Sequence, residues 1–281
     1  MIPASFEYER ARSVDEAVGL LGRDEDAKLL AGGHSLIPAM RLRISRPSLL
    51  VDIGRLDDLR YVREDGDRIA IGALTRHAAL VRDPVLAQHC ALIGEAAALI
   101  GDPQVRHRGT IGGSVAHGDP ASDLATILLT LDADLVARGS DGERTIPASE
   151  FFTGAFETAL ARQEMLIEIR IPKVAAGTYL KHVRRKHDWA TVAVAAARFD
   201  GRVQIGLTSM GPTPLRARRV EEAFVRGDSP ASAAAYTADG TEPPSDVSAS
   251  SEYRAHLAQV DRKSTRLNSS HCLVSRMPSS A

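Results

Sequence analysis

The segment Leu30-Ala31-Gly32-Gly33-His34-Ser35-Leu36-Ile37-Pro38 carries the first of two glycine-rich turns, and Thr110-Ile111-Gly112-Gly113-Ser114 carries the second. Paired glycines leave backbone N–H groups unshielded, so the chain can close around a phosphate group without a charged side chain. A serine follows each pair, and the first turn lies where a predicted strand leads into a predicted helix, whose N-terminus favours an anion. Two such turns about eighty residues apart predict a pyrophosphate held from two sides.

Length and composition are those of an ordinary globular protein. The 281 residues are 44% hydrophobic and 25% charged, which allows a substantial core and two domains. The formal net charge of −1 provides no overall field that would attract nucleic acid or an anionic membrane. No apolar run approaches the roughly 20 residues of a membrane span, and the N-terminus has no signal pattern. The sequence therefore predicts a cytoplasmic protein.

Neither turn matches a standard nucleotide-binding fingerprint. No Gly-x-Gly-x-x-Gly follows the first predicted strand, and no Lys-Ser/Thr pair follows either Gly-Gly, as a P-loop requires. A single Gly-Gly is often no more than a tight turn. Two in tandem, each with a serine, favour phosphate binding outside the Rossmann and P-loop folds.

Metal and nucleophile chemistry are not expected on this chain. Cys90 and Cys272 are too few and too far apart for an iron–sulfur cluster, a structural zinc site or a disulfide framework. The histidines that flank the turns, His34, His107 and His117, lack ligand spacing and are expected at most to line a groove. No catalytic triad or carboxylate pair stands out, so no catalytic residue is predicted and the reactive atoms are assigned to a cofactor.

Periodicity and capping residues predict an α+β chain up to a boundary near 173–178. Ser13, Thr75 and Ser122 are expected to cap helices. Helices are predicted over 14–21, 35–42, 75–81, 92–100 and 122–131, and strands over 27–31, 49–53, 68–73, 134–137 and 165–171.

The remainder predicts a second, smaller α+β domain. Three strand-like runs are spaced as an antiparallel meander, followed by helical segments; the strands are 179–184, 190–199 and 203–208, and the helical segments 215–225, 229–236 and 253–260. The last twenty residues contain six serines, no acid and no apolar periodicity, and 262–271 resembles translated adaptor sequence. We therefore expect 261–281 to be a non-native or disordered tail that replaces the native C-terminus.

Two features outside the turns are open to more than one interpretation. Asp123 is either an acid that favours the first turn of a helix or a carboxylate that accepts ribose or diol hydroxyls. The run Arg184-Arg185-Lys186-His187 before Asp188-Trp189 is either a solvated surface or a hairpin that presents charge and the only tryptophan to a ligand or partner.

The two turns, together with Ile100 to Ser114 and Asp119-Pro120-Ala121-Ser122-Asp123, resemble the FAD-binding medium subunit of aerobic carbon monoxide dehydrogenases. That subunit belongs to the wider xanthine dehydrogenase class of molybdenum hydroxylases. The resemblance runs from residue 1 to about residue 260. It implies a two-lobed FAD-binding domain of the vanillyl-alcohol-oxidase (PCMH) type over 1–174, with lobes of about 1–55 and 56–174. A C-terminal domain with a three-stranded antiparallel sheet would occupy 175–260.

By the same resemblance, both turns hold the FAD pyrophosphate, which assigns cofactor-binding roles to Ala31, Gly32, Gly33, His34, Ser35, Thr110, Ile111, Gly112, Gly113 and Ser114. The resemblance also implies contacts of Asp123 with the ribityl or phosphate region, of Leu166 or Ile167 and of Ile100 with the flavin, and of Lys181 with the FAD site. Trp189 stands where relatives often have tyrosine, which keeps an aromatic ring near the flavin.

The implied activity is electron transfer within a complex. A large subunit would oxidise the substrate at a molybdenum cofactor, and a small subunit would pass electrons through two [2Fe–2S] clusters to non-covalent FAD on this chain, as a dimer of heterotrimers. Two alternatives remain open from the residues. One is a stand-alone flavin oxidase, which the small second domain and the 4% aromatic content disfavour, and the other is a binding protein that has lost the flavin.

Overall fold

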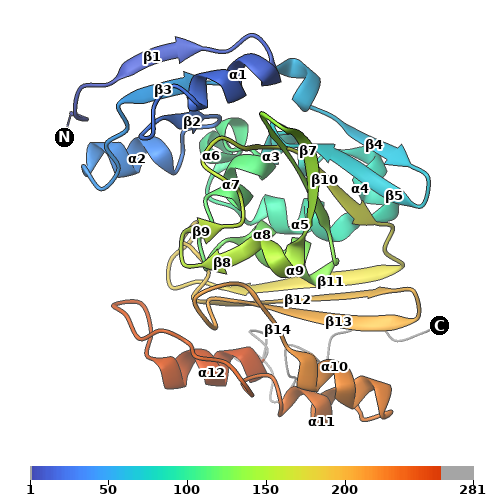
Figure 1. Cartoon of the computed structure of the whole chain (residues 1–281). Coiled ribbons are helices and arrows are strands. Elements are labelled where there is room, and N and C mark those ends of the chain that lie inside the picture. The colour runs from blue at the N-terminus through green and yellow to red at the C-terminus, as the bar shows by residue number, and fades with distance from the viewer. Residues whose placement is uncertain (1, 261–281) are drawn as a thin grey trace.

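A computed structural model describes residues 2–260, and the predicted tail lies outside these residues. The described residues form three sheets of three or more strands and a small two-stranded sheet, and most of the helices lie between or beside the larger sheets (Figure 1). The sequence predicts an α+β chain, and the structure confirms that helices and strands are mixed along it.

The N-terminal sheet has three parallel strands in the order β1-β3-β2. Its strands are β1 (Glu7–Arg10), β2 (Lys28–Leu30) and β3 (Leu49–Asp52), and its helices are α1 (Val14–Leu21) and α2 (Leu36–Arg41). As predicted, Ser13 caps α1, and its hydroxyl accepts a hydrogen bond from the Glu16 N–H at 3.1 Å. The first glycine turn is the connection from β2 to α2.

The middle sheet has five antiparallel strands in the order β4-β5-β10-β6-β7. Its strands are β4 (Val62–Asp65), β5 (Arg68–Gly72), β6 (Asp134–Gly139), β7 (Gly142–Pro147) and β10 (Met165–Pro172). The short elements beside it are the 3₁₀ turn η1 (Asp57–Leu59), α9 (Ala148–Phe151), β8 (Phe152–Gly154) and β9 (Glu157–Thr158).

Six helices lie between β5 and β6 along the chain: α3 (His77–Leu80), α4 (Pro84–His89), α5 (Ala91–Ala98), α6 (Pro103–Arg108), α7 (Ile111–Ala116) and α8 (Asp123–Thr130). The second glycine turn is the start of α7. The prediction that Thr75 caps α3 is wrong. Arg76 precedes that helix, and the Thr75 hydroxyl instead accepts from the N–H of Tyr61 and donates to its carbonyl.

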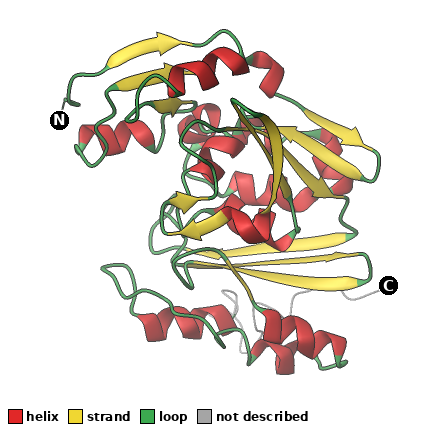
Figure 2. Cartoon of the chain, in the orientation of Figure 1, coloured by secondary structure: helices red, strands yellow, loops and turns green. Residues whose placement is uncertain are grey.

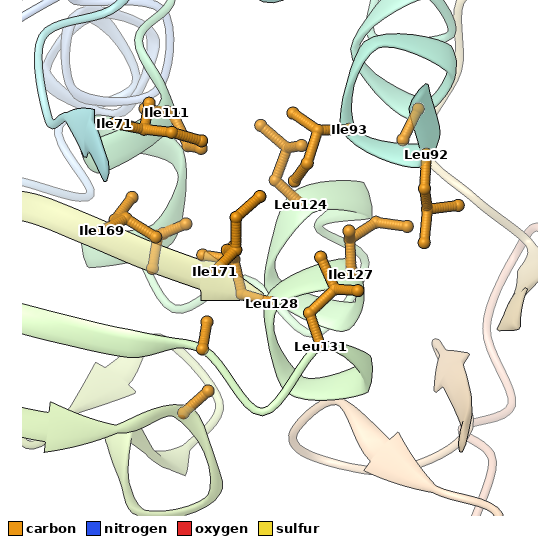
Figure 3. Close-up of a cluster of buried hydrophobic side chains, with 14 of the residues drawn as sticks. Ile71, Leu92, Ile93, Ile111, Leu124, Ile127, Leu128, Leu131, Ile169 and Ile171 are labelled. Atoms are coloured by element: carbon orange, nitrogen blue, oxygen red, sulfur yellow. The ribbon is translucent and has the colours of Figure 1, made fainter. Parts of the chain in front are cut away.

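The helix α8 is the centre of the molecule, because all of its residues are buried. Figure 3 shows Leu124, Ile127 and Leu128 of α8 among side chains from β5, α5 and β10. The same cluster includes Tyr179 and Phe199 of the C-terminal sheet. One hydrophobic core therefore joins the middle and C-terminal parts of the chain.

The C-terminal sheet has four antiparallel strands in the order β11-β12-β13-β14, not the three that were predicted. The strands are β11 (Ala176–His182), β12 (Val192–Phe199), β13 (Arg202–Thr208) and β14 (Leu215–Arg216), followed by α10 (Arg218–Val225), α11 (Pro230–Ala234) and α12 (Ser251–Gln259). The predicted helix over 215–225 begins three residues late, because Leu215–Arg216 pairs with β13. Ion pairs from Arg216 to Asp132 and Glu221, at 2.8 and 2.7 Å, accompany that pairing.

Both faces of β12 are buried, and its residues alternate accordingly. Ala193, Ala195 and Ala197 belong to the core around α8, whereas Val192 and Val194 belong to the core shared with α10–α12. Figure 2 shows helices on both sides of this sheet.

We expect Gly206→Ala to lower the free energy of unfolding by about 1–3 kcal/mol, as overpacking does. A Cβ at Gly206 would overlap the Thr130 hydroxyl and lie 3.0 Å from Thr126 Cγ2, where β13 crosses α8. Gly19→Ala is the matched control, because Gly19 is exposed on α1 and nothing lies within 4 Å of its Cβ position. It should raise the stability by up to about 1 kcal/mol. Urea unfolding measures both, and wild-type stability of Gly206→Ala would contradict the packing.

Candidate functional site

The two glycine turns lie side by side. A Cβ on Gly32 would collide with the Arg108 carbonyl oxygen and lie 2.8 Å from Gly109 Cα. A Cβ on Gly113 would lie 3.7 Å from the Ala31 Cβ. The absence of side chains at Gly32 and Gly113 therefore lets the N-terminal sheet and the middle helices approach at this point.

The first turn presents a row of free hydrogen-bond donors. The N–H groups of Gly32, Gly33, His34 and Ser35 donate to no residue within the described 2–260. Gly33 has φ +76°, a left-handed conformation that glycine adopts without strain. Consecutive free N–H groups in a turn form a concave anion site. The first turn therefore has the geometry of an anion site, and its contact with a cofactor stays a prediction.

The second turn is built differently. The N–H groups of Ile111 and Gly112 donate to the carbonyls of Thr75 and Ala73 at 3.0 and 2.8 Å. Those of Gly113 and Ser114 donate to Thr110, to its hydroxyl at 3.2 Å and its carbonyl at 3.0 Å. The expectation of a second row of free donors is therefore wrong, because α7 and its packing on 73–75 already use them. This turn offers the bare Gly113 surface and the Ser114 hydroxyl, and its contact with a cofactor stays a prediction.

Ser122 connects the second turn to α8. It precedes that helix as predicted, but its hydroxyl makes no capping bond and lies 3.2 Å from the Ser114 hydroxyl. The next residue, Asp123, is the first of α8. The contact between the Ser114 and Ser122 hydroxyls therefore links the second glycine turn to the start of α8, where Asp123 lies.

Asp123 and Lys181 form a buried ion pair. Lys181 Nζ lies 2.8 Å from Asp123 Oδ2, and the two side chains are 4% and 3% exposed. The Tyr179 hydroxyl donates to Asp123 Oδ1 at 2.5 Å. Burial raises the pKa of Asp123, and the Lys181 ammonium and the Tyr179 hydroxyl oppose that rise. Burial also raises the pKa of Tyr179 well above its usual value.

Lys181 also donates to the Leu99 carbonyl at 3.3 Å, which ties β11 to the turn that follows α5. Arg106 of α6 donates to two carbonyls of that turn, those of Ile100 and Gly101, at 2.9 and 3.0 Å. His187 Nδ1 lies 2.7 Å from the same Gly101 oxygen. These contacts bring the predicted flavin neighbour Ile100 close to the loop that carries Trp189.

Trp189 is 56% exposed in the connection between β11 and β12, so its ring is available to a ligand. Other predicted residues are less accessible. The side chains of Ile111 and Leu166 lie in the core around α8. Ile167 lies at a bulge in β10 and, like Ala31, packs against the N-terminal core.

Sequence reasoning missed His77, which lies under the contact between the two turns. Its ring is 3% exposed and packs against Gly109, where a Cβ would lie 2.7 Å from His77 Cδ2. Its Nδ1 has no partner among the described residues. Burial, together with the smaller effects of the nearby Arg106 and His34 charges, lowers the pKa of His77 to about 4. The imidazole is therefore neutral at physiological pH. Nothing in the local pattern marks this histidine as buried.

The described residues contain neither a metal-binding cluster nor a membrane-spanning helix. No group of three or more His, Cys, Asp or Glu side chains within 2–260 is arranged to hold a metal ion. No helix in that part of the chain is long and apolar enough to cross a membrane.

Comparison with known proteins gives consistent matches along the chain. Residues 4–174 match the family model "FAD binding domain in molybdopterin dehydrogenase", and residues 177–262 match "CO dehydrogenase flavoprotein C-terminal domain". The carbon monoxide dehydrogenase medium chain of Hydrogenophaga pseudoflava is 43% identical over 272 residues, covering 92% of this chain and 94% of that protein. The 6-hydroxypseudooxynicotine dehydrogenase complex subunit alpha of Paenarthrobacter nicotinovorans is 39% identical, covering 92% and 93%.

A solved structure of carbon monoxide dehydrogenase from Hydrogenophaga pseudoflava, in a form that lacks the Mo-pyranopterin moiety, superimposes with a TM-score of 0.87. The sequences are 42% identical, and the match covers 92% of this chain and 94% of that one.

We expect the stability of the protein to fall by about 1.4 kcal/mol per pH unit between pH 6.5 and 4 because of His77. In this window the unfolded chain takes up a proton on His77 that the folded chain does not, so acid favours unfolding. Urea unfolding at several pH values measures the slope. His77→Gln should remove this contribution, and His107→Gln, at an exposed histidine, should keep the wild-type slope. Equal slopes in the two variants would contradict a neutral buried His77.

Proposed function

This chain belongs to the FAD-binding medium subunits of the carbon monoxide dehydrogenase and xanthine dehydrogenase family, and from that premise we propose how it binds and uses FAD. It is the flavoprotein component of an oxidoreductase. We propose that the FAD pyrophosphate binds at Gly32–Ser35 with Gly113 opposite. The single observation that carries this assignment is the row of four N–H groups that have no acceptor within the described chain.

The residues at this point fit a pyrophosphate. Backbone N–H groups bind phosphate oxygens without a positive side chain, and glycine permits the close approach that such binding needs. The imidazole of His77 beneath the turns is neutral, so the attraction for the phosphate comes from the backbone N–H groups. The buried, unpaired Nδ1 of His77 is also a polar atom for which the protein supplies no partner within 2–260.

We assign the remaining predicted residues by their place around this point. Thr110, Ile111, Gly112 and Ser114 support the wall opposite the first turn. Ile100, Lys181 and Trp189 serve the isoalloxazine end, since Lys181 and His187 tie their segments together. Asp123 acts through Lys181, whose ammonium it holds in place. We assign supporting roles behind the site to Ile167, at the bulge of β10, and to Leu166, in the core around α8.

When bound, FAD accepts electrons one at a time and delivers them as a pair, which suits a carrier between one-electron clusters and a terminal acceptor. The protein binds the cofactor, orients it and shields it from water. Two cysteines in the whole chain are fewer than one four-cysteine cluster needs, so we assign the [2Fe–2S] clusters and the molybdenum cofactor to partner subunits.

For the assembly we propose a small [2Fe–2S] subunit and a large molybdenum subunit, joined with this chain in a dimer of heterotrimers. Within the chain, we propose that 1–174 is an FAD-binding domain of the vanillyl-alcohol-oxidase (PCMH) type and that 175–260 is the C-terminal domain. A cytoplasmic location stays a prediction from the sequence. Two relatives at 43% and 39% identity carry the names of different substrates, carbon monoxide and 6-hydroxypseudooxynicotine. We therefore assign substrate choice to the large subunit.

The proposal is tested on the complex purified from cells that express all three subunits. We expect a flavin absorption band that bleaches under anaerobic conditions when a substrate of the large subunit is added. Removal of the iron–sulfur subunit should abolish the bleaching. Bleaching of the isolated chain by a small organic substrate would instead support a stand-alone oxidase, and no flavin uptake at all would contradict the proposal.

We expect Gly113→Asp to weaken FAD binding more than about a hundredfold. A carboxylate about 4 Å from a phosphate costs about 4 kcal/mol at an effective dielectric constant of 20. Gly113 has helical backbone inside α7, but a Cβ there would lie 2.8 Å from Thr110 Oγ1, so the Thr110 side chain must shift in Gly113→Asp and Gly113→Ala alike. Gly113→Ala separates size from charge, and Gly19→Asp at an exposed position of α1 is the matched control. Flavin fluorescence titration measures the affinities, and full flavin retention in Gly113→Asp would refute the assignment.

A further inference from the structure

The turn that follows α2 is ordered, basic and apolar at once. We call residues 41–46 the 41–46 turn; it reads Arg-Leu-Arg-Ile-Ser-Arg. Leu42 and Ile44 are 64% and 79% exposed, although large aliphatic side chains are usually buried. Figure 1 shows α2 and this turn at the outer edge of the N-terminal sheet.

The backbone of the 41–46 turn is fixed by hydrogen bonds. The N–H of Arg43 donates to the Met40 carbonyl at 3.0 Å, and the N–H of Ile44 donates to the Ala39 carbonyl at 2.9 Å. These bonds form a Schellman motif, which usually places glycine at the left-handed position and packs the next residue against the helix. Here Arg43 takes the left-handed position at φ +60°, and Ile44 extends into solvent.

Two residues of this turn are therefore unfavourable for the isolated fold. An arginine at a left-handed position is strained, and an exposed isoleucine gives up its packing. Strained backbone positions are found preferentially at functional sites. This combination indicates that the turn binds another molecule rather than stabilising the fold.

The charges of the 41–46 turn are not balanced by the chain. Arg41, Arg43 and Arg46 form no ion pair with any residue of the described 2–260. The segment 36–48 contains no acidic residue. Protein interfaces are enriched in arginine, and their charges complement those of the partner. The partner that fits this turn has an acidic surface with a small apolar contact.

The position of the turn relates it to the cofactor site. The helix α2 has six residues, and its first turn packs on the first glycine turn, since Ile37 Cγ1 lies 3.1 Å from the Cβ position of Gly33. Six helical residues span about 9 Å. A partner at the far end of α2 would lie within about that distance of the proposed pyrophosphate site.

We propose that the 41–46 turn docks the iron–sulfur subunit that delivers electrons to this chain. The inference rests on the proposed function. A [2Fe–2S] cluster with four cysteine thiolate ligands has a net negative charge, which the three arginines of the turn complement. Leu42 and Ile44 would fill an apolar contact on the same subunit.

The test uses the complete complex, purified through a tag on this chain, with the iron-to-flavin ratio as the readout. Arg41→Glu/Arg43→Glu should lower the ratio at least tenfold and leave flavin per chain unchanged. Leu42→Ser/Ile44→Ser should also lower it. Arg202→Glu/Arg218→Glu is the matched control, because both arginines are exposed and have no ion pair within the described residues. The control should keep the wild-type ratio.

A second variant separates docking from folding. Arg43→Gly should raise or maintain the melting temperature, because glycine relieves the strained position, and should still make the complex dissociate at lower salt. A wild-type ratio and salt response in all variants of the turn would overturn the proposal. A halved particle mass with unchanged iron would also overturn it, because a second copy of this chain would then occupy the turn. If wild-type chains bind no flavin, the proposed function fails instead.

Discussion

The ion pair between Asp123 and Lys181 joins the two halves of the molecule. Asp123 begins α8, the helix whose residues are all buried, and Lys181 belongs to the first strand of the C-terminal sheet. Neither charge can be removed alone without leaving the other buried and uncompensated, which typically costs 3–5 kcal/mol. The pair therefore fixes the register of β11 on α8. Through the Leu99 carbonyl it also fixes the turn that carries Ile100.

The sequence was informative where local chemistry decides the structure. The helices α1, α5 and α8 and the strands β3, β5 and β10 lie within a few residues of their predicted positions, because capping residues and apolar periodicity specify them locally. The fourth strand of the C-terminal sheet was not predictable in this way. Leu215–Arg216 pairs with β13 while Arg216 binds Asp132, more than eighty residues away, and no local pattern reports such a contact.

The candidate site shows the same division. The two glycine turns were found by their residue types, whereas Asp123 and Lys181 were assigned through the family resemblance. The structure brings the members of each pair together. His77 and Tyr179 were missed as site residues, because only tertiary burial distinguishes them from ordinary members of a helix and a strand. The second turn looked like a copy of the first. Its N–H groups are satisfied by residues 73–75 and by Thr110, and these partners lie partly outside the motif.

The family boundary between residues 174 and 177 does not divide the chain into independent cooperative units. Tyr179, Phe199 and the alanines of β12 contribute to the same core as Ile127 of α8 and Ile71 of β5. A fragment cut at this boundary would expose apolar surface that the other fragment normally covers. The two modules are thus one folding unit. Recombination between relatives at this point would have to exchange the facing surface of α8 together with the sheet.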